Sequence, residues 1–237
     1  MIAFCGDRVL LIDTDTQANL ALSLGIKDYE YSLADVLSQK ISAQDAIIKA
    51  RKNLDLIPSS LKLFKAQQRM VMEMAREEIF DALFGQIPDY NYQIFDCAPS
   101  LTLLTVNAMY YVDEVFIPVS MEMLAVAGMR QFVTYLKEIS RMLGRETVVR
   151  LIIPSFYDPR RRVSAQVMAS LRHDFGSRVT HPIRIDTKLS EAPGYGKTIY
   201  EYAPHSRGSV DYAKLTELVA AQTVNTVNSE ERRVKSG

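Results

Sequence analysis

The sequence is poor in cysteine, in long apolar runs and in net charge. Its 237 residues include only two cysteines, Cys5 and Cys97, too few for a disulfide framework and typical of a reducing cytoplasm. No apolar run reaches the length of about 18 residues that a membrane-spanning helix needs, so a membrane partner is not expected. The short apolar stretch Ile2–Cys5 lacks a cationic flank and a small-residue cleavage site, which argues against a signal peptide.

Other absences exclude further classes of site and of domain organisation. The three histidines lie far apart without cysteine or carboxylate ligands at zinc-site spacing, so a zinc site is not predicted. Cys97 has no histidine near it in the sequence and is expected to pack as a small hydrophobe rather than to act as a nucleophile. No linker and no internal repeat divides the chain. We therefore expect a single domain over residues 1–224 and a polar tail over residues 225–237.

The formal net charge of zero hides an uneven distribution. Residues 1–140 hold 12 basic and 18 acidic side chains, a balance of −6, whereas residues 141–237 hold 16 and 10, a balance of +6. The second part includes Arg160, Arg161, Arg162, Arg172, Arg178, Arg184, Lys188, Lys197 and Arg207. Such a basic surplus favours contacts with phosphates, although a simple solvated basic face would read the same way.

Short apolar runs alternate with stretches of helical period. The predicted strands are Val9–Asp13, Leu54–Pro58, Tyr92–Asp96, Glu114–Val119, Val148–Pro154 and, more weakly, Val179–Ile185. The predicted helices are Ser32–Gln39, Ala43–Arg51, Leu61–Phe84, Leu101–Tyr111, Ala125–Leu143, Ser164–Phe175 and Val210–Val224. This alternation predicts a doubly wound α/β fold, with a mostly parallel sheet flanked by helices.

Two of these apolar runs end in aspartate. Val9–Asp13 is followed by Asp15, and Tyr92–Asp96 leads into the segment before Ser100. Ligands of parallel sheets bind beyond the carboxyl ends of the strands, and Mg²⁺ prefers carboxylate oxygens. One such aspartate alone could simply cap the next helix. Two strand ends with a third carboxylate nearby favour a Mg²⁺–phosphate site.

Three blocks carry a resemblance to a known family. They are VLLIDTDTQANLALSLGI, YNYQIFDCAPSLTLLTVNAMYYVDEVFIPV and KLSEAPGYGKTIYEYAPHSRGSVDYAKL, in this order along the chain. Together they resemble the ParA/Soj-type partition ATPases of chromosomes and plasmids. These are deviant-Walker P-loop proteins related to MinD, and the likeness spans about residues 8–220.

The resemblance implies roles for individual residues. Asp15 matches the aspartate that helps to place the attacking water, Asp13 lies beside the metal, and Asp96 matches the Walker B residue that holds Mg²⁺. Lys188 and Arg207 match basic positions that contact DNA without reading its sequence. The family also implies ATP and Mg²⁺ as cofactors, a homodimer, a ParB-like centromere-binding partner and a cytoplasmic, nucleoid-associated location.

One family element is missing. The family has a strand, a glycine-rich phosphate-binding loop and a helix before the strand that matches Val9–Asp13, but here only Gly6–Arg8 separates that strand from Ile2–Cys5. A parallel crossover needs about a dozen residues, so Ile2–Cys5 cannot lie in the family position and should extend the next strand or stay loose. Gly196-Lys197-Thr198 imitates the end of the loop, but no apolar strand precedes it and Pro193 interrupts the segment.

Three functions therefore stay open. The chain is a partition ATPase whose loop is absent from this sequence, a pseudo-ATPase that binds DNA or a partner, or a metabolic P-loop relative such as an amide-forming synthetase. Since backbone amides of the loop cradle the phosphates, this form is predicted to be unable to bind ATP normally and to be inactive as an ATPase.

Overall fold

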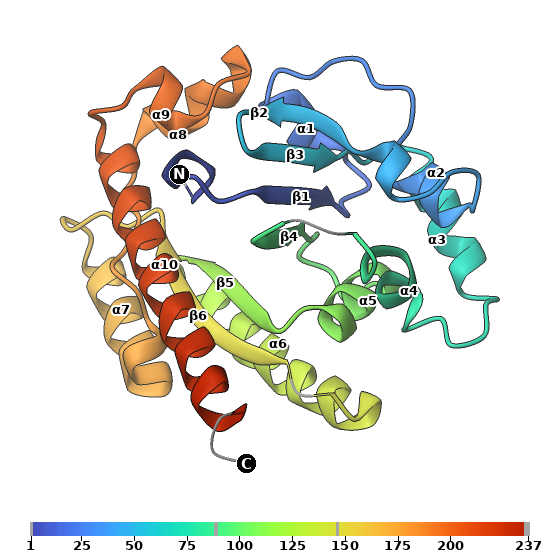
Figure 1. Cartoon of the computed structure of the whole chain (residues 1–237). Helices are drawn as coiled ribbons and strands as arrows, with labels where there is room; N and C mark the ends of the chain where they lie inside the picture. Colours follow the sequence, from blue (N-terminus) through green and yellow to red (C-terminus); the bar gives the residue numbers. More distant parts are fainter. Residues whose placement is uncertain (1, 88–89, 146, 235–237) are drawn as a thin grey trace.

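The computed structural model describes residues 2–87, 90–145 and 147–234, with the side chains of residues 4, 5 and 222–234 left aside. The first half of the chain folds into a short 3-10 helix, a four-stranded sheet and the helices around it (Figure 1). In order, its elements are η1 (Ile2–Cys5), β1 (Val9–Asp13), α1 (Asn19–Ser23), α2 (Leu33–Leu37), η2 (Gln44–Ala46), β2 (Ile48–Arg51), β3 (Leu54–Ile57), α3 (Leu63–Met70), α4 (Ile79–Phe84) and β4 (Tyr92–Asp96).

The second half holds two strands and the longer helices. In order, its elements are α5 (Leu103–Tyr111), β5 (Glu114–Ser120), α6 (Met123–Leu143), β6 (Val148–Ser155), α7 (Arg162–Phe175), η3 (Gly176–Arg178), α8 (Thr187–Glu191), η4 (Ala192–Tyr195), α9 (Ile199–Tyr202) and α10 (Arg207–Val234). None of the helices within the described residues is long and apolar enough to cross a membrane.

The strands form two separate sheets rather than one. The first has the order β2-β3-β1-β4, in which β1 is parallel to both β3 and β4 and only β2 is antiparallel. The second consists of β5 and β6, which are parallel to each other. Figure 1 shows β5 and β6 below β4, with α5 connecting the two sheets. The predicted doubly wound, mostly parallel fold is confirmed, but its sheet is interrupted between β4 and β5.

Both sheets are covered on both faces. In the first sheet, Leu10 and Ile12 pack with α2, α3, α4 and α5 on one side, whereas Leu56 packs with α1 on the other. In the second, Ile152 packs with α6 and α7, and Leu151 packs with α10. Alternate side chains of a strand point to opposite faces, so near-continuous apolar runs are what a doubly covered strand requires.

Several predicted elements differ from the structure. Ala43–Arg51 was predicted to be helical, yet it forms η2 and the edge strand β2, because pairing with β3 outweighs local helix propensity. The single helix predicted over Leu61–Phe84 divides into α3 and α4. Val179–Ile185 makes only isolated bridges to β6 and the segment after it.

The two ends of the chain also differ from expectation. The stretch Ile2–Cys5 is neither a strand nor an extension of β1, because it forms η1, where Ile2 packs with the apolar cluster between β6 and α10. Helix α10 continues to Val234, beyond the predicted end at Val224 and into the predicted polar tail. The remaining tail residues, 235–237, lie outside the described residues.

Candidate functional site

The carboxyl ends of β1 and β4 bring two acidic residues together. Asp13 and Asp96 are register partners across the parallel pair. Thr14 secures this end of the sheet, because its backbone N–H donates to the Asp96 carbonyl oxygen at 2.9 Å and its hydroxyl donates to the same oxygen at 2.8 Å. Thr14 was not singled out from the sequence, since a threonine after a strand carries no distinctive signal.

Asp13 organises the loop that follows β1. Its Oδ1 accepts a hydrogen bond from the Asp15 backbone N–H at 3.0 Å, and its Oδ2 accepts one from the Leu20 N–H at 3.3 Å. Asp15 in turn accepts from the Gln17 N–H at 3.0 Å. The loop contains Ala18 in the left-handed region with φ 53°. The three predicted acidic residues therefore lie on one sheet edge, with Asp13 fully buried and Asp15 partly exposed.

Desolvation disfavours the ionised form of the carboxylates at this edge. Desolvation raises the pKa of Asp13 from 3.8 to about 6; the two backbone hydrogen bonds oppose this change and the charges of Asp96 and Asp15 add to it. Asp96 is exposed at the strand end, and its pKa is also raised, first by the partial desolvation of its carboxylate and then by the charge of Asp15. A divalent cation would lower the free-energy cost of ionising these carboxylates, because its positive charge neutralises them. The chemistry of the donor set therefore fits Mg²⁺.

Protein ligands alone do not complete a metal site. Within residues 2–87, 90–145 and 147–234, no group of three histidine, cysteine, aspartate or glutamate side chains is arranged to hold a metal ion. Mg²⁺ commonly keeps several water ligands and takes one or two carboxylates, so Asp13 and Asp96 would form one side of its coordination shell. Cys97 adds no nucleophile, since burial raises the pKa of its thiol.

The residues present do not fit the triphosphate. Gly6, Asp7 and Arg8 precede β1 and so lie at its amino end, whereas Asp13 and Asp96 lie at the carboxyl end. A five-residue strand separates the two ends by roughly 16 Å at about 3.3 Å per residue. The backbone amides of Gly6–Arg8 therefore cannot cradle phosphates beside the carboxylates.

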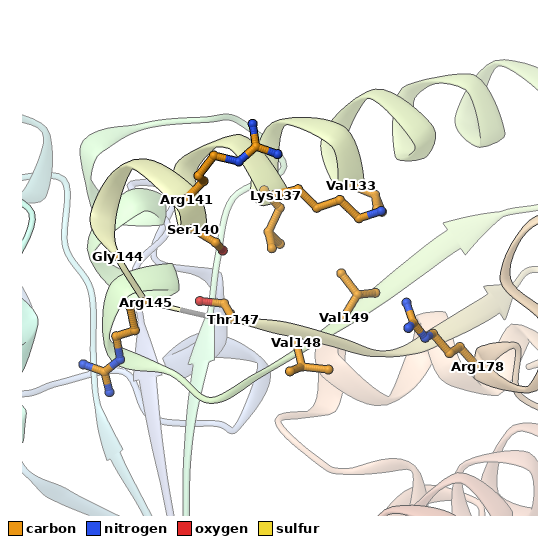
Figure 2. Close-up of a pocket in the computed structure, with 11 residues that line it drawn as sticks. Val133, Lys137, Ser140, Arg141, Gly144, Arg145, Thr147, Val148, Val149 and Arg178 are labelled. Atoms are coloured by element: carbon orange, nitrogen blue, oxygen red, sulfur yellow. The ribbon is translucent and has the colours of Figure 1, made fainter.

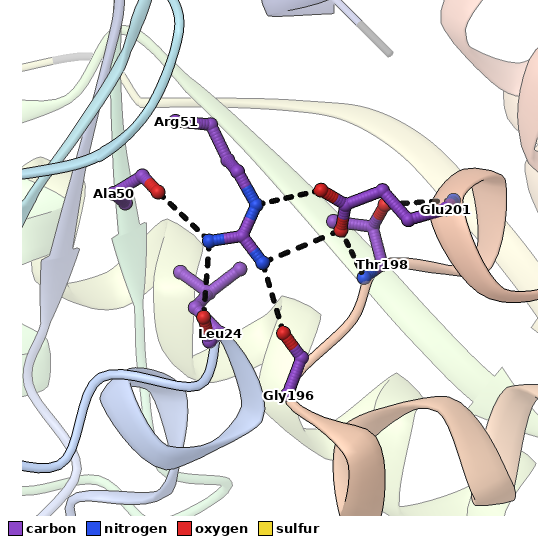
Figure 3. A network of polar contacts seen from close by, with 6 residues as sticks. All are labelled: Leu24, Ala50, Arg51, Gly196, Thr198 and Glu201. Carbon is purple, nitrogen blue, oxygen red and sulfur yellow. Dashed lines mark hydrogen bonds and ion pairs between the residues drawn. The ribbon is translucent and has the colours of Figure 1, made fainter.

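The segment Gly196-Lys197-Thr198 has a structural task instead (Figure 3). Gly196 ends η4 with φ 62°, and Thr198 caps α9 in a reciprocal pair with Glu201. Arg51, from β2, donates to Glu201 Oε1 at 2.8 Å and to the Gly196 carbonyl oxygen at 2.9 Å. The third guanidinium nitrogen, Nη1, donates to the carbonyl oxygens of Leu24 and Ala50. We call this set of contacts the Arg51 clamp.

A close backbone approach accompanies the Arg51 clamp. A Cβ on Gly196 would lie 2.5 Å from the Gly25 Cα, so neither glycine tolerates a side chain without movement. The clamp joins the first sheet to the α8–α9 region, two segments about 150 residues apart in the chain. Sequence reasoning missed it because Arg51 was placed at the end of a predicted helix.

Asp186 brings the two predicted DNA-contact residues onto adjoining elements. Its Oδ1 accepts from the Lys188 backbone N–H at 3.0 Å, and its Oδ2 accepts from the Gly208 N–H at 2.8 Å. The amino ends of α8 and α10 are thereby tied together, which places Lys188 and Arg207 at one junction. Lys188 is paired with Glu191 at 2.8 Å, whereas Arg207 is exposed.

Other members of the basic set are already engaged. Arg184 makes a bidentate pair with the buried Asp211, with both N–O distances at 2.8 Å. Arg160 pairs with Asp158 at 3.0 Å through two nitrogens. Arg184 is therefore committed to a buried partner, whereas Arg160 stays 88% exposed in its pair. The balance of +6 for residues 141–237 already counts both aspartates.

A cavity lies near the amino end of β6, away from the acidic edge (Figure 2). It has a volume of about 430 Å³, with Val133, Leu136 and Val149 among its apolar lining residues. Its basic lining residues are Lys137, Arg141, Arg145 and Arg178. Val148 and Val149 open strand β6, so this cavity is near the amino end of the second sheet and apart from the acidic edge.

Comparison with known proteins finds relatives that align with most of this chain. A family model described as "AAA domain" matches residues 1–148. The sporulation initiation inhibitor protein Soj of Bacillus subtilis is 36% identical over 226 residues, which cover 93% of this chain and 89% of Soj. The chromosome partitioning protein ParA of Caulobacter vibrioides is 33% identical over 229 residues, covering 93% and 85% of the two chains.

A solved structure supports the fold. Cobyrinic acid a,c-diamide synthase from Mycobacterium smegmatis, with a bound ATP analog and magnesium, matches with a TM-score of 0.73 and 25% identity. The match covers 89% of this chain and 82% of the synthase. Taken with the relatives that align over most of their length, these findings establish that the chain belongs to the family of ParA- and Soj-type partition ATPases.

Proposed function

We propose that this chain acts as a ParA-like partition protein, in the segregation or positioning of a chromosome, a plasmid or another large cargo. The observation that carries the proposal is the register pair Asp13–Asp96 at the carboxyl ends of neighbouring parallel strands, with Asp15 in the loop between β1 and α1. Relatives that are named as partition proteins support it over an amide-forming synthetase, because they are more similar in sequence than the synthase is.

In this proposal the acidic edge serves nucleotide chemistry. Asp13 and Asp96 would hold Mg²⁺, largely through water, and Asp15 would orient an attacking water, in a form of the chain that has a phosphate-binding loop. In that form ATP would promote homodimerisation, and the dimer would bind DNA through Lys188 and Arg207 without sequence preference. A ParB-like partner would stimulate release, and DNA binding would place the cytoplasmic protein on the nucleoid.

The form described here binds ATP poorly, because the residues at the acidic edge offer no phosphate cradle. Isothermal titration with Mg-ATP is expected to give no saturable binding at micromolar concentrations. Saturable micromolar binding that Asp96→Ala abolishes would contradict this part of the proposal. The same separation between Gly6–Arg8 and the carboxylates favours the second candidate function, a pseudo-ATPase that binds DNA or a partner without hydrolysis.

The DNA contact is testable without nucleotide. The double substitution Lys188→Glu and Arg207→Glu should weaken a salt-sensitive gel shift with duplex DNA by at least about tenfold, since each lost phosphate contact weakens binding. A matched control, Lys62→Glu with Lys65→Glu, changes the net charge equally on exposed residues of the other half. Equal binding by both double variants would refute a DNA role for Lys188 and Arg207.

A further inference from the structure

The cavity near the amino end of β6 combines an apolar wall with a basic rim. Val133 and Leu136 on α6 and Val148 and Val149 on β6 make the apolar wall. Val148 is 41% exposed, so part of this wall is in contact with solvent. The volume of about 430 Å³ is within the range of ligand-binding pockets and is large enough for an aromatic side chain. We call this cavity the basic cavity.

Three cations on its rim are available to a ligand. Lys137 and Arg141 are exposed and lie one turn apart on α6, about 6 Å along the helix axis, and Arg178 is exposed at the end of η3. Within the part of the chain that the structure describes, none of the three forms an ion pair. None of the described lining residues is acidic. These charges therefore lack a counter-charge among the described residues.

The fourth basic lining residue, Arg145, has a different task. It donates to Asp81 Oδ1 at 3.4 Å and to the Tyr111 carbonyl oxygen at 3.2 Å, and its guanidinium lies over the Tyr110 ring. Figure 2 shows its side chain directed away from the space between α6 and β6. Arg145 thus joins the end of α6 to α4 and α5 and is not counted among the available charges.

Duplex DNA is the obvious alternative ligand for exposed cations, but the basic cavity does not suit it. Contacts with DNA phosphates come from basic and polar groups and make no use of an apolar wall. Here the apolar wall lies among the cations, with Lys137 and Arg141 on α6 above the strand and Arg178 beside Val149 (Figure 2). The ligand that fits has an apolar group for the wall and anionic groups on more than one side of it.

We propose that the basic cavity binds an acidic segment of a partner protein. One bulky apolar side chain of the segment enters the cavity, and carboxylates before and after it in the segment contact Lys137, Arg141 and Arg178. A compact ligand with a single anionic group would meet these cations on one side only, because they come from two elements. A buried apolar anchor supplies affinity, and the charges around it supply selectivity and fast association.

The test exploits the lack of tryptophan in this chain. The full chain is added to the peptide acetyl-Gly-Glu-Glu-Trp-Glu-Glu-Gly-amide, whose tryptophan then reports alone. Fluorescence anisotropy should rise to saturation, and the emission should shift to the blue because the indole ring leaves water. Added salt should weaken binding, since it screens exposed charges. The same peptide with glutamine in place of all four glutamates should bind at least about tenfold more weakly.

A charge-reversal pair tests the basic rim. Lys137→Glu with Arg178→Glu should weaken peptide binding at least about tenfold, because both exposed cations become anions. The matched control, Lys62→Glu with Lys65→Glu, changes the net charge equally on exposed residues away from the cavity and should bind the peptide as the wild type does.

A second pair tests the apolar wall. Val148→Ser should weaken binding by about threefold to tenfold and reduce the blue shift, since the wall loses apolar area. Met142→Ser, at an 84% exposed residue of α6 that does not line the cavity, should change neither quantity.

Three outcomes would overturn the proposal. The first is a lack of saturable binding by the acidic peptide. The second is equal binding by the glutamine peptide or by the variant with both Lys137→Glu and Arg178→Glu. The third is displacement of the bound peptide by duplex DNA together with loss of the DNA gel shift in that variant, which would assign these cations to DNA. None of these outcomes depends on nucleotide binding, so the acidic edge is tested separately.

Discussion

Replacing Asp13 by asparagine should make the protein more stable at neutral and alkaline pH. In the folded chain the pKa of Asp13 is about 6, compared with its ordinary value of 3.8. Each pKa unit corresponds to about 1.4 kcal/mol, so ionising this buried carboxyl opposes folding by about 3 kcal/mol at pH 8. Asparagine removes that cost. It gives up one of the two acceptors for the Asp15 and Leu20 amides, a loss of about 1 kcal/mol.

The sign of the pH dependence follows from proton binding. Between about pH 4 and pH 6 the folded state holds the Asp13 proton and the unfolded state has released it, so the free energy of unfolding falls as pH rises. We therefore expect Asp13→Asn to be about 2 kcal/mol more stable than the wild type at pH 8. The advantage should disappear below pH 4, where the wild-type carboxyl is protonated in both states.

Urea unfolding followed by circular dichroism, at pH values from 4 to 8, measures this difference directly. Asp28→Asn, at an exposed aspartate, is the matched control and should shift stability by less than about 0.5 kcal/mol. Magnesium should stabilise the wild type and not Asp13→Asn, because bound ligand favours the folded state. An asparagine variant that is less stable at pH 8, or that keeps the wild-type pH slope, would refute the reasoning.

Two further substitutions test other parts of the structure. Arg51→Ala should lower the free energy of unfolding by about 2–4 kcal/mol, because it leaves Glu201 and three partly buried carbonyls without their donor. The control Lys49→Ala, on the same strand, should have little effect in the same urea titration. Asp211→Ala should cost about 3 kcal/mol at pH 7, since it leaves Arg184 unpaired. Arg184 holds the pKa of Asp211 below its ordinary value against the opposing effect of burial. The stability lost in Asp211→Ala should therefore shrink as pH falls below about 4, where the wild-type carboxyl becomes protonated. An unchanged loss of stability at pH 3 would contradict that account.

Much of the fold and the acidic edge could be predicted because both depend on local pattern. Apolar runs that end in aspartate predicted β1 and β4, and parallel strands must present their carboxyl ends at one edge. The sequence also placed Asp15 beside this strand end, the resemblance added its role, and the structure places its backbone N–H against Asp13. These inferences needed no knowledge of contacts between distant segments.

The remaining features depend on such contacts. Strand β2 has a sequence that suits a helix, and its antiparallel pairing with β3 decides otherwise. The Arg51 clamp joins residues about 150 positions apart, which no periodicity reveals. The arginines of the basic set look alike in the sequence, yet the buried Asp211 engages Arg184 and leaves Arg207 exposed. The interruption between β4 and β5 likewise becomes visible only when strand neighbours are assigned.

The split sheet has a consequence for how the molecule resists force and heat. No continuous hydrogen-bonded ladder carries tension from Tyr92–Asp96 across to Glu114–Ser120. The two halves are joined instead by the packing of α5, the Arg51 clamp with the close approach of Gly25 and Gly196, and the Arg145–Asp81 ion pair. Force or heat that separates the halves must therefore break side-chain contacts rather than a shared hydrogen-bonded ladder.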